Sequence, residues 1–356
     1  MNKEASEIAL KVADEMNQIQ KVIDEDNLIN SFKMLSHEKD KQFDELNVIR
    51  FKINNNHQIF TSKVDSLVDF YSKGENYQIA LKMEIYSIYD EINNKGEVRY
   101  IDVRRSKATG EIMVILVCLY KDFPQLPDLA KDIEKIKGVT SLILNYNPKK
   151  TNVILGKTDY LVFGEPQITD KIGDLKFKIS PESFFQINSL QTPRLYNLAI
   201  KQANLKPTDV VVDAYSGIGT IGLSVAKHVK SVRGIEVVRD AVKDANANAK
   251  LNGINNAKYT TGKAEKIMPR WASEGMKTDV IFVDPPRKGL TPEFIDAAVK
   301  TKPKKIVYIS CNPATLVRDL QLFQTKDYIF NRIDAVDMFP QTPHVESVTV
   351  LERTDK

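Results

Sequence analysis

The pattern of hydrophobic and polar positions changes twice along this chain. Near the start, apolar residues recur every three or four positions, as on one face of an α-helix, at Ala5, Ile8, Val12, Met16, Ile19 and Ile23. From Tyr77 to about Ile179 the pattern becomes short β-branched and aromatic runs separated by turns. After Ser180, runs of strand length alternate with helical runs. We therefore predict a helical segment at 1–73, a smaller α+β middle domain at 74–179 and an α/β domain at 180–356.

The last part has the most regular pattern. Its predicted strands are 210–213, 231–236, 257–261, 280–284, 305–310, 329–338 and 345–351. The predicted helices are 220–229, 239–252, 292–301 and 314–323. Such alternation predicts a doubly wound, mostly parallel sheet with helices on both faces. Because the last two strands follow each other directly, the final strand should be antiparallel.

The middle part should contain strands at 98–103, 112–120, 141–145, 151–155 and 160–163. Basic residues lie at the edges of these runs: Arg99, Arg104, Arg105, Lys107, Lys149, Lys150 and Lys157. They form either an ordinary solvated face or a surface that contacts phosphate groups.

Composition narrows the class of protein. The 356 residues are 42% hydrophobic and 28% charged, as in soluble globular proteins. No apolar run is long enough to span a bilayer, and the first residues lack a signal-peptide core. We expect a cytoplasmic protein without a membrane partner. The net charge of +4 only weakly favours a nucleic-acid partner.

The two cysteines, Cys118 and Cys311, are far apart in the sequence. This number excludes a disulfide framework, a four-thiolate zinc site and a four-thiolate iron–sulfur cluster. We expect no bound metal.

A glycine-rich turn follows the first strand of the α/β domain. Gly217, Gly219 and Gly222 in the stretch 210–226 have the GxGxxG spacing that lets a backbone approach a ligand. The next strand ends at Glu236, whose carboxylate can accept hydrogen bonds from both ribose hydroxyls. This combination suits either NAD or S-adenosylmethionine.

Residues at the ends of two further strands are candidates for a functional role. Asp284 begins the loop DPPRKG, which leaves the strand. Its two prolines make the backbone extended and rigid and remove two N–H groups, which suits packing against a planar base. Cys311 follows a buried strand at the edge where α/β sheets bind ligands. A thiol there can be a nucleophile, although free cysteines are often inert core residues.

The motifs together resemble those of the RNA uracil-C5 methyltransferases, in order and spacing, over about residues 90–352. They are PESFFQINSLQT (181–192), DAYSGIGTIGL (213–223), GIEVVRDAVKDANANAKLNGI (234–254), VDPPRKGL (283–290), SCNPATLVRD (310–319) and FPQTPHVESV (339–348). The stretches 96–117 and 145–156 look most like the 23S rRNA branch. The resemblance implies a class I methyltransferase fold, S-adenosylmethionine as cofactor and 5-methyluridine in RNA as product.

By this resemblance, Cys311 is the nucleophile that adds to uracil C6, and Glu346 removes the C5 proton. The expected cofactor-binding residues are Gln186, Tyr215, Gly217, Gly219, Thr220, Glu236 and Asp284. His344 is an alternative base, and Arg287 and Lys288 are candidates for phosphate contact. Since the target uridine must leave its stack, Phe184, Phe185 and Phe339 are candidate stacking partners, with core packing as the alternative.

The chain departs from many relatives in two respects. It shows neither the pattern of an N-terminal RNA-binding β-barrel nor four cysteines for an iron–sulfur cluster. A tRNA uracil-C5 methyltransferase and a catalytically silent RNA-binding or ribosome-assembly factor are the alternative functions. A cytosine-C5 enzyme fits poorly, because its nucleophile would occupy the position of the 285–287 loop.

Overall fold

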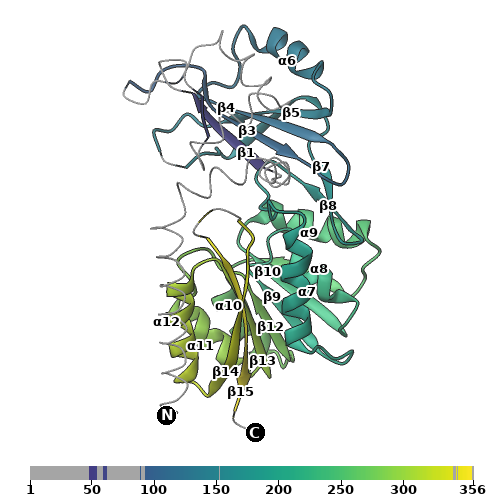
Figure 1. Cartoon of the computed structure of the whole chain (residues 1–356), viewed down its shortest axis with the longest axis vertical. Coiled ribbons are helices and arrows are strands. Elements are labelled where there is room, and N and C mark those ends of the chain that lie inside the picture. The colour runs from purple at the N-terminus through teal and green to yellow at the C-terminus, as the bar shows by residue number, and fades with distance from the viewer. Residues whose placement is uncertain are drawn as a thin grey trace, which may run out of the picture. The chain divides into compact units, whose positions relative to one another are not determined.

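The computed structural model describes residues 89, 93–151, 153–339, 342 and 344–354, and the backbone of 48–53 and 59–61. These residues form two compact units. Residues 188–354 with 172–177 make the C-terminal unit, and the described residues of 43–171 with 178–187 make the middle unit. No helix of this described part is long and apolar enough to cross a membrane. Figure 1 draws both units.

A seven-stranded sheet organises the C-terminal unit. Its strands are β9 (Val210–Ala214), β10 (Ser231–Glu236), β11 (Ala257–Thr261), β12 (Val280–Val283), β13 (Lys305–Ser310), β14 (Tyr328–Val336) and β15 (Glu346–Arg353). They are ordered β11-β10-β9-β12-β13-β15-β14. The first five are parallel, whereas β15 is antiparallel to β13 and β14. The predicted α/β class, mostly parallel with an antiparallel finish, is confirmed.

Helices cover both faces of this sheet (Figure 1). They are α7 (Gln191–Ala203), α8 (Thr220–Ala226), α9 (Arg239–Leu251), α10 (Ala264–Ser273), α11 (Pro292–Lys300) and α12 (Pro313–Gln324). Helices α10, α11 and α12 pack on one face, where side chains such as Trp271, Phe294 and Phe323 join strand residues in one buried cluster. The sequence analysis did not predict α10, since Pro269 lies inside it. Burial of its apolar face outweighs the cost of that proline.

The middle unit is built on a six-stranded sheet. Its strands are β1 (Val48–Ile53), β2 (Ile59–Thr61), β3 (Val98–Arg105), β4 (Ile112–Cys118), β5 (Val139–Tyr146) and β6 (Thr158–Gly164), ordered β2-β1-β3-β4-β5-β6. Helix α6 (Leu126–Glu134) connects the parallel pair β4 and β5 and packs its apolar face on the sheet. Strands β7 (Ile168–Ile172) and β8 (Leu175–Ile179) form a separate two-stranded sheet, whose residues 172–177 belong to the C-terminal unit.

Two stretches differ from the sequence predictions. Strands β1 and β2 lie inside the segment predicted as helical, 1–73, and β1 pairs with β3. The helical pattern at 5–23 lies outside the described residues. The strand predicted at 151–155 is a loop, because the Asn147 side chain donates to the carbonyls of Val153 and Ile154 and so occupies ladder acceptors.

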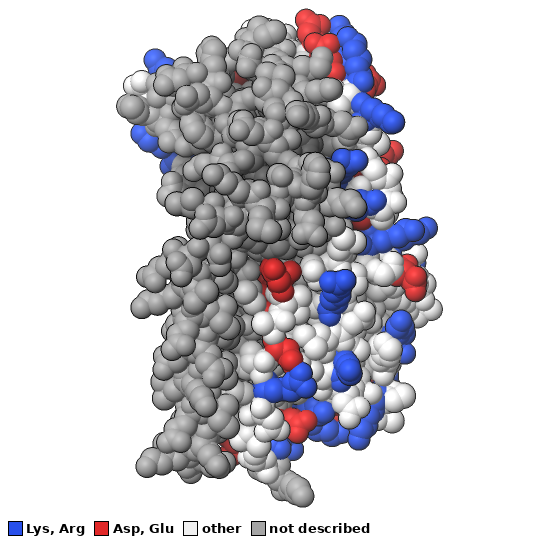
Figure 2. All heavy atoms as spheres, in the orientation of Figure 1, with Lys and Arg blue, Asp and Glu red and all other residues white. Residues whose placement is uncertain are grey.

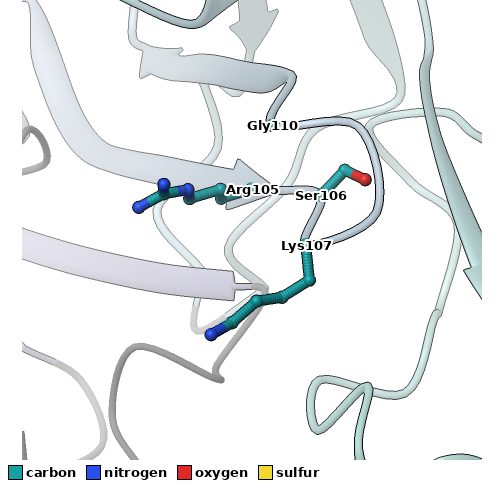
Figure 3. Close-up of a pocket in the computed structure, with 4 residues that line it drawn as sticks. All are labelled: Arg105, Ser106, Lys107 and Gly110. Atoms are coloured by element: carbon teal, nitrogen blue, oxygen red, sulfur yellow. The ribbon is translucent and has the colours of Figure 1, made fainter. Parts of the chain in front are cut away.

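The turn between β3 and β4 contains a small hollow of about 100 Å³, lined by Arg105, Ser106, Lys107 and Gly110. Figure 3 shows the Arg105 and Lys107 side chains extending to the same side of the turn, away from the Ser106 hydroxyl. Beneath the turn, the buried Asp170 carboxylate accepts the Ala108 N–H at 3.3 Å. The turn is therefore fixed from below, while its two cationic side chains are exposed.

Candidate active site

The register of the parallel strands brings several predicted site residues to one edge of the sheet. Ala214 pairs with Ile235 on one side and with Val283 on the other. The residues that come next are Tyr215, Glu236 and Asp284, and parallel strands end at the same edge. These three predicted cofactor-binding residues are therefore neighbours at the edge of the sheet where its parallel strands have their carboxyl ends.

The glycine turn between β9 and α8 is held against Glu236. Gly217 and Gly219 have φ values of +52° and +87°, which glycine adopts without strain, and Tyr215 also has a positive φ of +65°. The Gly217 N–H donates to Glu236 Oε2 at 3.1 Å, and the Val238 N–H donates to Oε1 at 2.9 Å. Each carboxylate oxygen retains capacity for another donor. Glu236 is thus oriented and can still accept hydrogen bonds.

Close packing explains the remaining glycines of this region. A Cβ on Gly222 would lie 2.6 Å from the Tyr259 hydroxyl, and one on Gly234 would lie 1.9 Å from Tyr259 Cδ1. The Gly222 N–H donates to Asp213 Oδ2 at 2.8 Å. Gly222 therefore serves the packing of α8 on the sheet.

Thr220, another predicted cofactor residue, begins α8. Its Oγ1 lies 2.9 Å from the Tyr196 hydroxyl of α7. Burial and the nearby Asp284 carboxylate raise the pKa of Tyr196, so its hydroxyl is neutral. The pair fixes the start of α8 at the edge that carries Tyr215.

Cys311 and Glu346 become neighbours through the antiparallel pairing of β13 and β15. Ser310 pairs with Ser347, so the next position on each strand places Cys311 beside Glu346. Glu346 is 3% exposed, and its Oε2 has no hydrogen-bond partner among the described residues. Cys311 is partly accessible. A thiol and a buried carboxyl group with a vacant acceptor therefore lie side by side.

The acidic groups of this edge have raised pKa values, and burial is the largest cause for each. Burial raises the pKa of Asp284 to about 7, while burial and the charge of Asp284 raise that of Glu346 to about 8. Burial, followed by the charges of Glu346 and Asp284, raises the pKa of the Cys311 thiol. Arg287 acts in the opposite direction on both Cys311 and Glu346.

The loop after β12 is fastened to the segment that carries Cys311. The Asn312 side-chain amide and the Thr315 hydroxyl donate to the Arg287 carbonyl at 3.1 and 3.2 Å. Asn312 also caps α12 by accepting the Ala314 N–H at 3.1 Å. Loop and nucleophile segment therefore hold each other in place.

Asp319 is the buried anchor of the same loop. Its Oδ2 accepts the Leu290 N–H and the Tyr308 hydroxyl, both at 2.7 Å. Arg318 donates to Asp319 and to the Leu290 carbonyl. The contacts of Asp319 and Arg318 therefore hold the loop at Leu290 in place.

His344 contacts Arg287, whose Nη2 lies 2.8 Å from both ring nitrogens. A guanidinium only donates, and a neutral imidazole has one acceptor nitrogen, so that nitrogen accepts from Arg287. That nitrogen is occupied, which argues against His344 as the proton acceptor. Arg287, considered from the sequence only for phosphate contact, is the cation that bears on the pKa values of this site.

The segment 178–187 belongs to the middle unit, where Gln186 is 5% exposed. The preceding turn is held by Arg104, which donates to the carbonyls of Ser180 and Ser183. The role of Gln186 as a cofactor ligand stays a prediction. Phe185 is buried as a core residue, whereas Phe184 is 68% exposed.

The sequence analysis missed Asp213. This residue is 1% exposed, its Oδ1 has no partner in the described part of the chain, and its pKa is raised by burial to about 7. An acid that directly follows the apolar run Val210–Val212, two residues before the predicted ligand Tyr215, was the available signal.

The chain is similar to known methyltransferases. It is 80% identical over 268 residues to an uncharacterized RNA methyltransferase of Lactobacillus johnsonii, covering 75% of this chain and 60% of that protein. It is 47% identical over 264 residues to one of Oceanobacillus iheyensis, covering 74% and 58%. The chain thus spans about 60% of the length of these relatives.

A solved structure also matches. The tRNA (uracil-54, C5)-methyltransferase of Pyrococcus abyssi, in complex with S-adenosyl-L-homocysteine, has 30% sequence identity and a TM-score of 0.69, covering 86% of this chain and 76% of that chain. The family model described as tRNA (uracil-5-)-methyltransferase matches residues 109–354, which is more than half of the chain. The chain belongs to the tRNA (uracil-5-)-methyltransferase family.

Proposed function

We propose that this protein transfers a methyl group from S-adenosylmethionine to C5 of a uridine in RNA. The observation that carries the proposal is the pairing of Cys311 with Glu346 at the sheet edge that also presents Glu236 and Asp284. A nucleophile and a base at one edge, beside a glycine turn, are what this reaction requires.

The residues at the edge fit the cofactor. Glu236, oriented by two backbone N–H groups, can accept from the ribose hydroxyls. Gly217 and Gly219 have no side chains to obstruct the turn, and Asp284 follows β12 next to Tyr215. When bound, S-adenosylmethionine supplies an electrophilic methyl group. The solved relative from Pyrococcus abyssi contains the demethylated form, S-adenosyl-L-homocysteine.

Cys311 acts first. Its thiolate forms a bond to uracil C6, and the electron pair of the C5–C6 double bond moves towards C5 and the O4 carbonyl, which makes C5 nucleophilic. Because the pKa of Cys311 is raised, the resting thiol is protonated, and this partly accessible group releases its proton to water as the C6–S bond forms. The Arg287 guanidinium favours the thiolate.

Glu346 acts after C5 has gained its methyl group. Its carboxylate takes the remaining C5 proton, the electron pair restores the C5–C6 double bond, and the C6–S bond breaks to release Cys311 as thiolate. Burial makes Glu346 a stronger base than an exposed glutamate, and its unpartnered Oε2 is available for the proton.

The substrate we favour is 23S rRNA, on the basis of the motifs at 96–117 and 145–156. The competing substrate is tRNA, which is supported by the name of the matching family and of the solved relative. In either case the uridine must leave its stack to expose C6 to the thiol.

Methyl transfer to defined RNAs tests the proposal. Tritiated S-adenosylmethionine is incubated with 23S rRNA or tRNA that lacks 5-methyluridine, and the nucleosides are separated after digestion. We expect label in 5-methyluridine from the wild type and none from Cys311→Ala. Absence of labelled 5-methyluridine from both RNAs would refute the proposed activity and favour a silent RNA-binding factor.

A further inference from the structure

The loop between β5 and β6 in the middle unit is held by a buried arginine. Arg99 is 3% exposed and donates to the carbonyls of Asn147, Lys149 and Thr151, at 2.9, 2.8 and 3.2 Å. Its guanidinium also lies 4.6 Å from the ring centroid of Tyr89. A buried cation that satisfies three carbonyls of one loop fixes the path of that loop.

Two asparagines hold the rest of the loop. Asn147 donates to the carbonyls of Val153 and Ile154, both at 2.8 Å. The Asn145 side chain accepts the Gly156 N–H at 2.6 Å and donates to the Gly156 carbonyl at 3.2 Å. Residues 147–151 and 153–157 therefore have a defined backbone without belonging to a helix or strand.

This fixed loop presents lysines beside tyrosines. Lys149, Lys150 and Lys157 are exposed, and Tyr160 on the edge strand β6 is 37% exposed. Lys121, which follows β4, lies 5.5 Å from the ring centroid of Tyr146. We call these six residues the lysine–tyrosine surface: Lys121, Tyr146, Lys149, Lys150, Lys157 and Tyr160.

The register brings the members of this surface together. Cys118 pairs with Tyr146, and Tyr146 pairs with Thr158, so the end of β4, the end of β5 and the start of β6 are adjacent. Tyr160 pairs with Leu144, two residues before Tyr146, and both tyrosines therefore lie on one face of the sheet.

The charge of the surface is positive. Among the described residues, the sequence places two acidic residues directly beside its members: Asp122, which accepts the Phe123 N–H, and Asp159, which accepts the Asn145 amide at 2.6 Å. The surface has four lysines. Elsewhere, on the face drawn in Figure 2, basic and acidic side chains are interspersed. At this edge of the middle unit, exposed lysines and two tyrosines are therefore found together.

We propose that the lysine–tyrosine surface binds a single-stranded part of the RNA substrate, with the lysines on phosphates and Tyr160 stacked against a base. The inference rests on the proposed function for the identity of the RNA. Lysines supply phosphate affinity without sequence information, and an exposed aromatic ring beside them supplies stacking. Because Arg99 and the two asparagines order the loop before RNA arrives, binding does not incur the entropy cost of ordering it.

Salt-dependent binding of a labelled oligouridylate tests this surface. The probe is a single strand of about 20 nucleotides, which exceeds the site size of most single-strand binders. The variants are the triple replacement Lys149→Ala, Lys150→Ala and Lys157→Ala, and a control with Lys131→Ala and Lys135→Ala. The control lysines lie on α6 in the same unit and pair with Asp128 and Asp132.

The loss of three phosphate contacts should make the plot of log affinity against log salt concentration less steep, by about 2 units of slope. At 0.1 M salt, each lost contact should weaken RNA binding by about fivefold. The control should bind as the wild type does. Tyr160→Ala should weaken binding by between about fivefold and 150-fold, and Tyr160→Phe, which keeps the ring, should restore it.

Unchanged affinity and salt slope in the triple variant, with its melting temperature preserved, would overturn the inference and leave a protein partner as the occupant. This outcome is separate from failure of the proposed function. Oligouridylate binding needs no catalysis, so a lysine-dependent slope supports the surface even if no RNA is methylated. Conversely, methylation with a lysine-independent slope would retain the activity and refute the surface.

Discussion

Replacing Glu346 with glutamine should make the C-terminal unit more stable while it abolishes turnover. The carboxyl group is 3% exposed and lies near Asp284, and these surroundings raise its pKa from 4.5 to about 8. A raised pKa means that the fold favours the protonated form. The carboxyl group's contribution to stability is therefore complete below pH 4.5 and is lost as the pH rises through 8.

The magnitude follows from the two pKa values. Each pKa unit corresponds to about 1.4 kcal/mol, so the ionised Glu346 costs about 5 kcal/mol at high pH, about 3 kcal/mol at pH 7 and less than about 1 kcal/mol at pH 5. Glutamine never ionises and avoids this cost, although its buried amide group, if unpaired, carries a penalty of about 1–3 kcal/mol that does not depend on pH. The change between pH 5 and pH 9 isolates the effect of ionisation and should reach about 4 kcal/mol.

Thermal unfolding followed by tryptophan fluorescence measures this change. The chain has a single tryptophan, Trp271, which is buried in the C-terminal unit. For a unit of this size, 4 kcal/mol corresponds to about 8–16 °C. The melting temperature of Glu346→Gln relative to wild type should therefore rise by that amount between pH 5 and pH 9.

The matched control is Glu352→Gln on the same strand, where the side chain is 52% exposed and pairs with Lys305. It should show no comparable gain with pH. A melting-temperature difference for Glu346→Gln that is the same at pH 5 and pH 9 would refute the assignment of Glu346 as a desolvated carboxyl group.

Three further substitutions probe the electrostatics and packing of the site. Arg287→Ala should raise the pKa of Cys311 and so shift the pH dependence of adduct formation to higher pH, because the guanidinium favours the thiolate; an unchanged pH profile would contradict this role. Asp319→Ala should destabilise the C-terminal unit by about 3–5 kcal/mol, since it removes a buried anion from its hydrogen-bonded partners; a loss below about 1 kcal/mol in urea unfolding would oppose it. Gly234→Ala should cost about 1–3 kcal/mol or more, because the new Cβ would lie 1.9 Å from Tyr259; unaltered urea unfolding would show that Tyr259 can move freely.

Much of the C-terminal unit could be predicted from the sequence. The alternation of strand and helix patterns locates β10, β11 and β13 at the bounds observed. Strand β13 is the most distinct of the three, because a buried parallel strand is a continuous apolar stretch. Helix α10 was not predicted, because Pro269 disfavours a helix locally. Burial of Trp271 and its neighbours stabilises the helix in the folded unit. Local propensity does not report such tertiary packing.

The candidate site could be predicted as a set of residues but not as an arrangement. Cys311 and Glu346 are distinct motifs in the sequence, and only the register of β13 with β15 makes them neighbours. The influence of Arg287 on Cys311 likewise depends on a loop whose position is set by Asp319 and Asn312. These are long-range contacts, which residue spacing does not encode.

A covalent bond between Cys311 and C6 of the target uridine can be trapped and identified. Target RNA that contains 5-fluorouridine is incubated with protein and S-adenosylmethionine, because fluorine at C5 cannot be removed as a proton and the C6–S bond should persist. The account predicts a denaturation-resistant complex whose cross-linked peptide, identified by mass spectrometry, contains Cys311, and no complex with Cys311→Ala. A complex that forms equally well with Cys311→Ala, or that is linked through another residue, would contradict it.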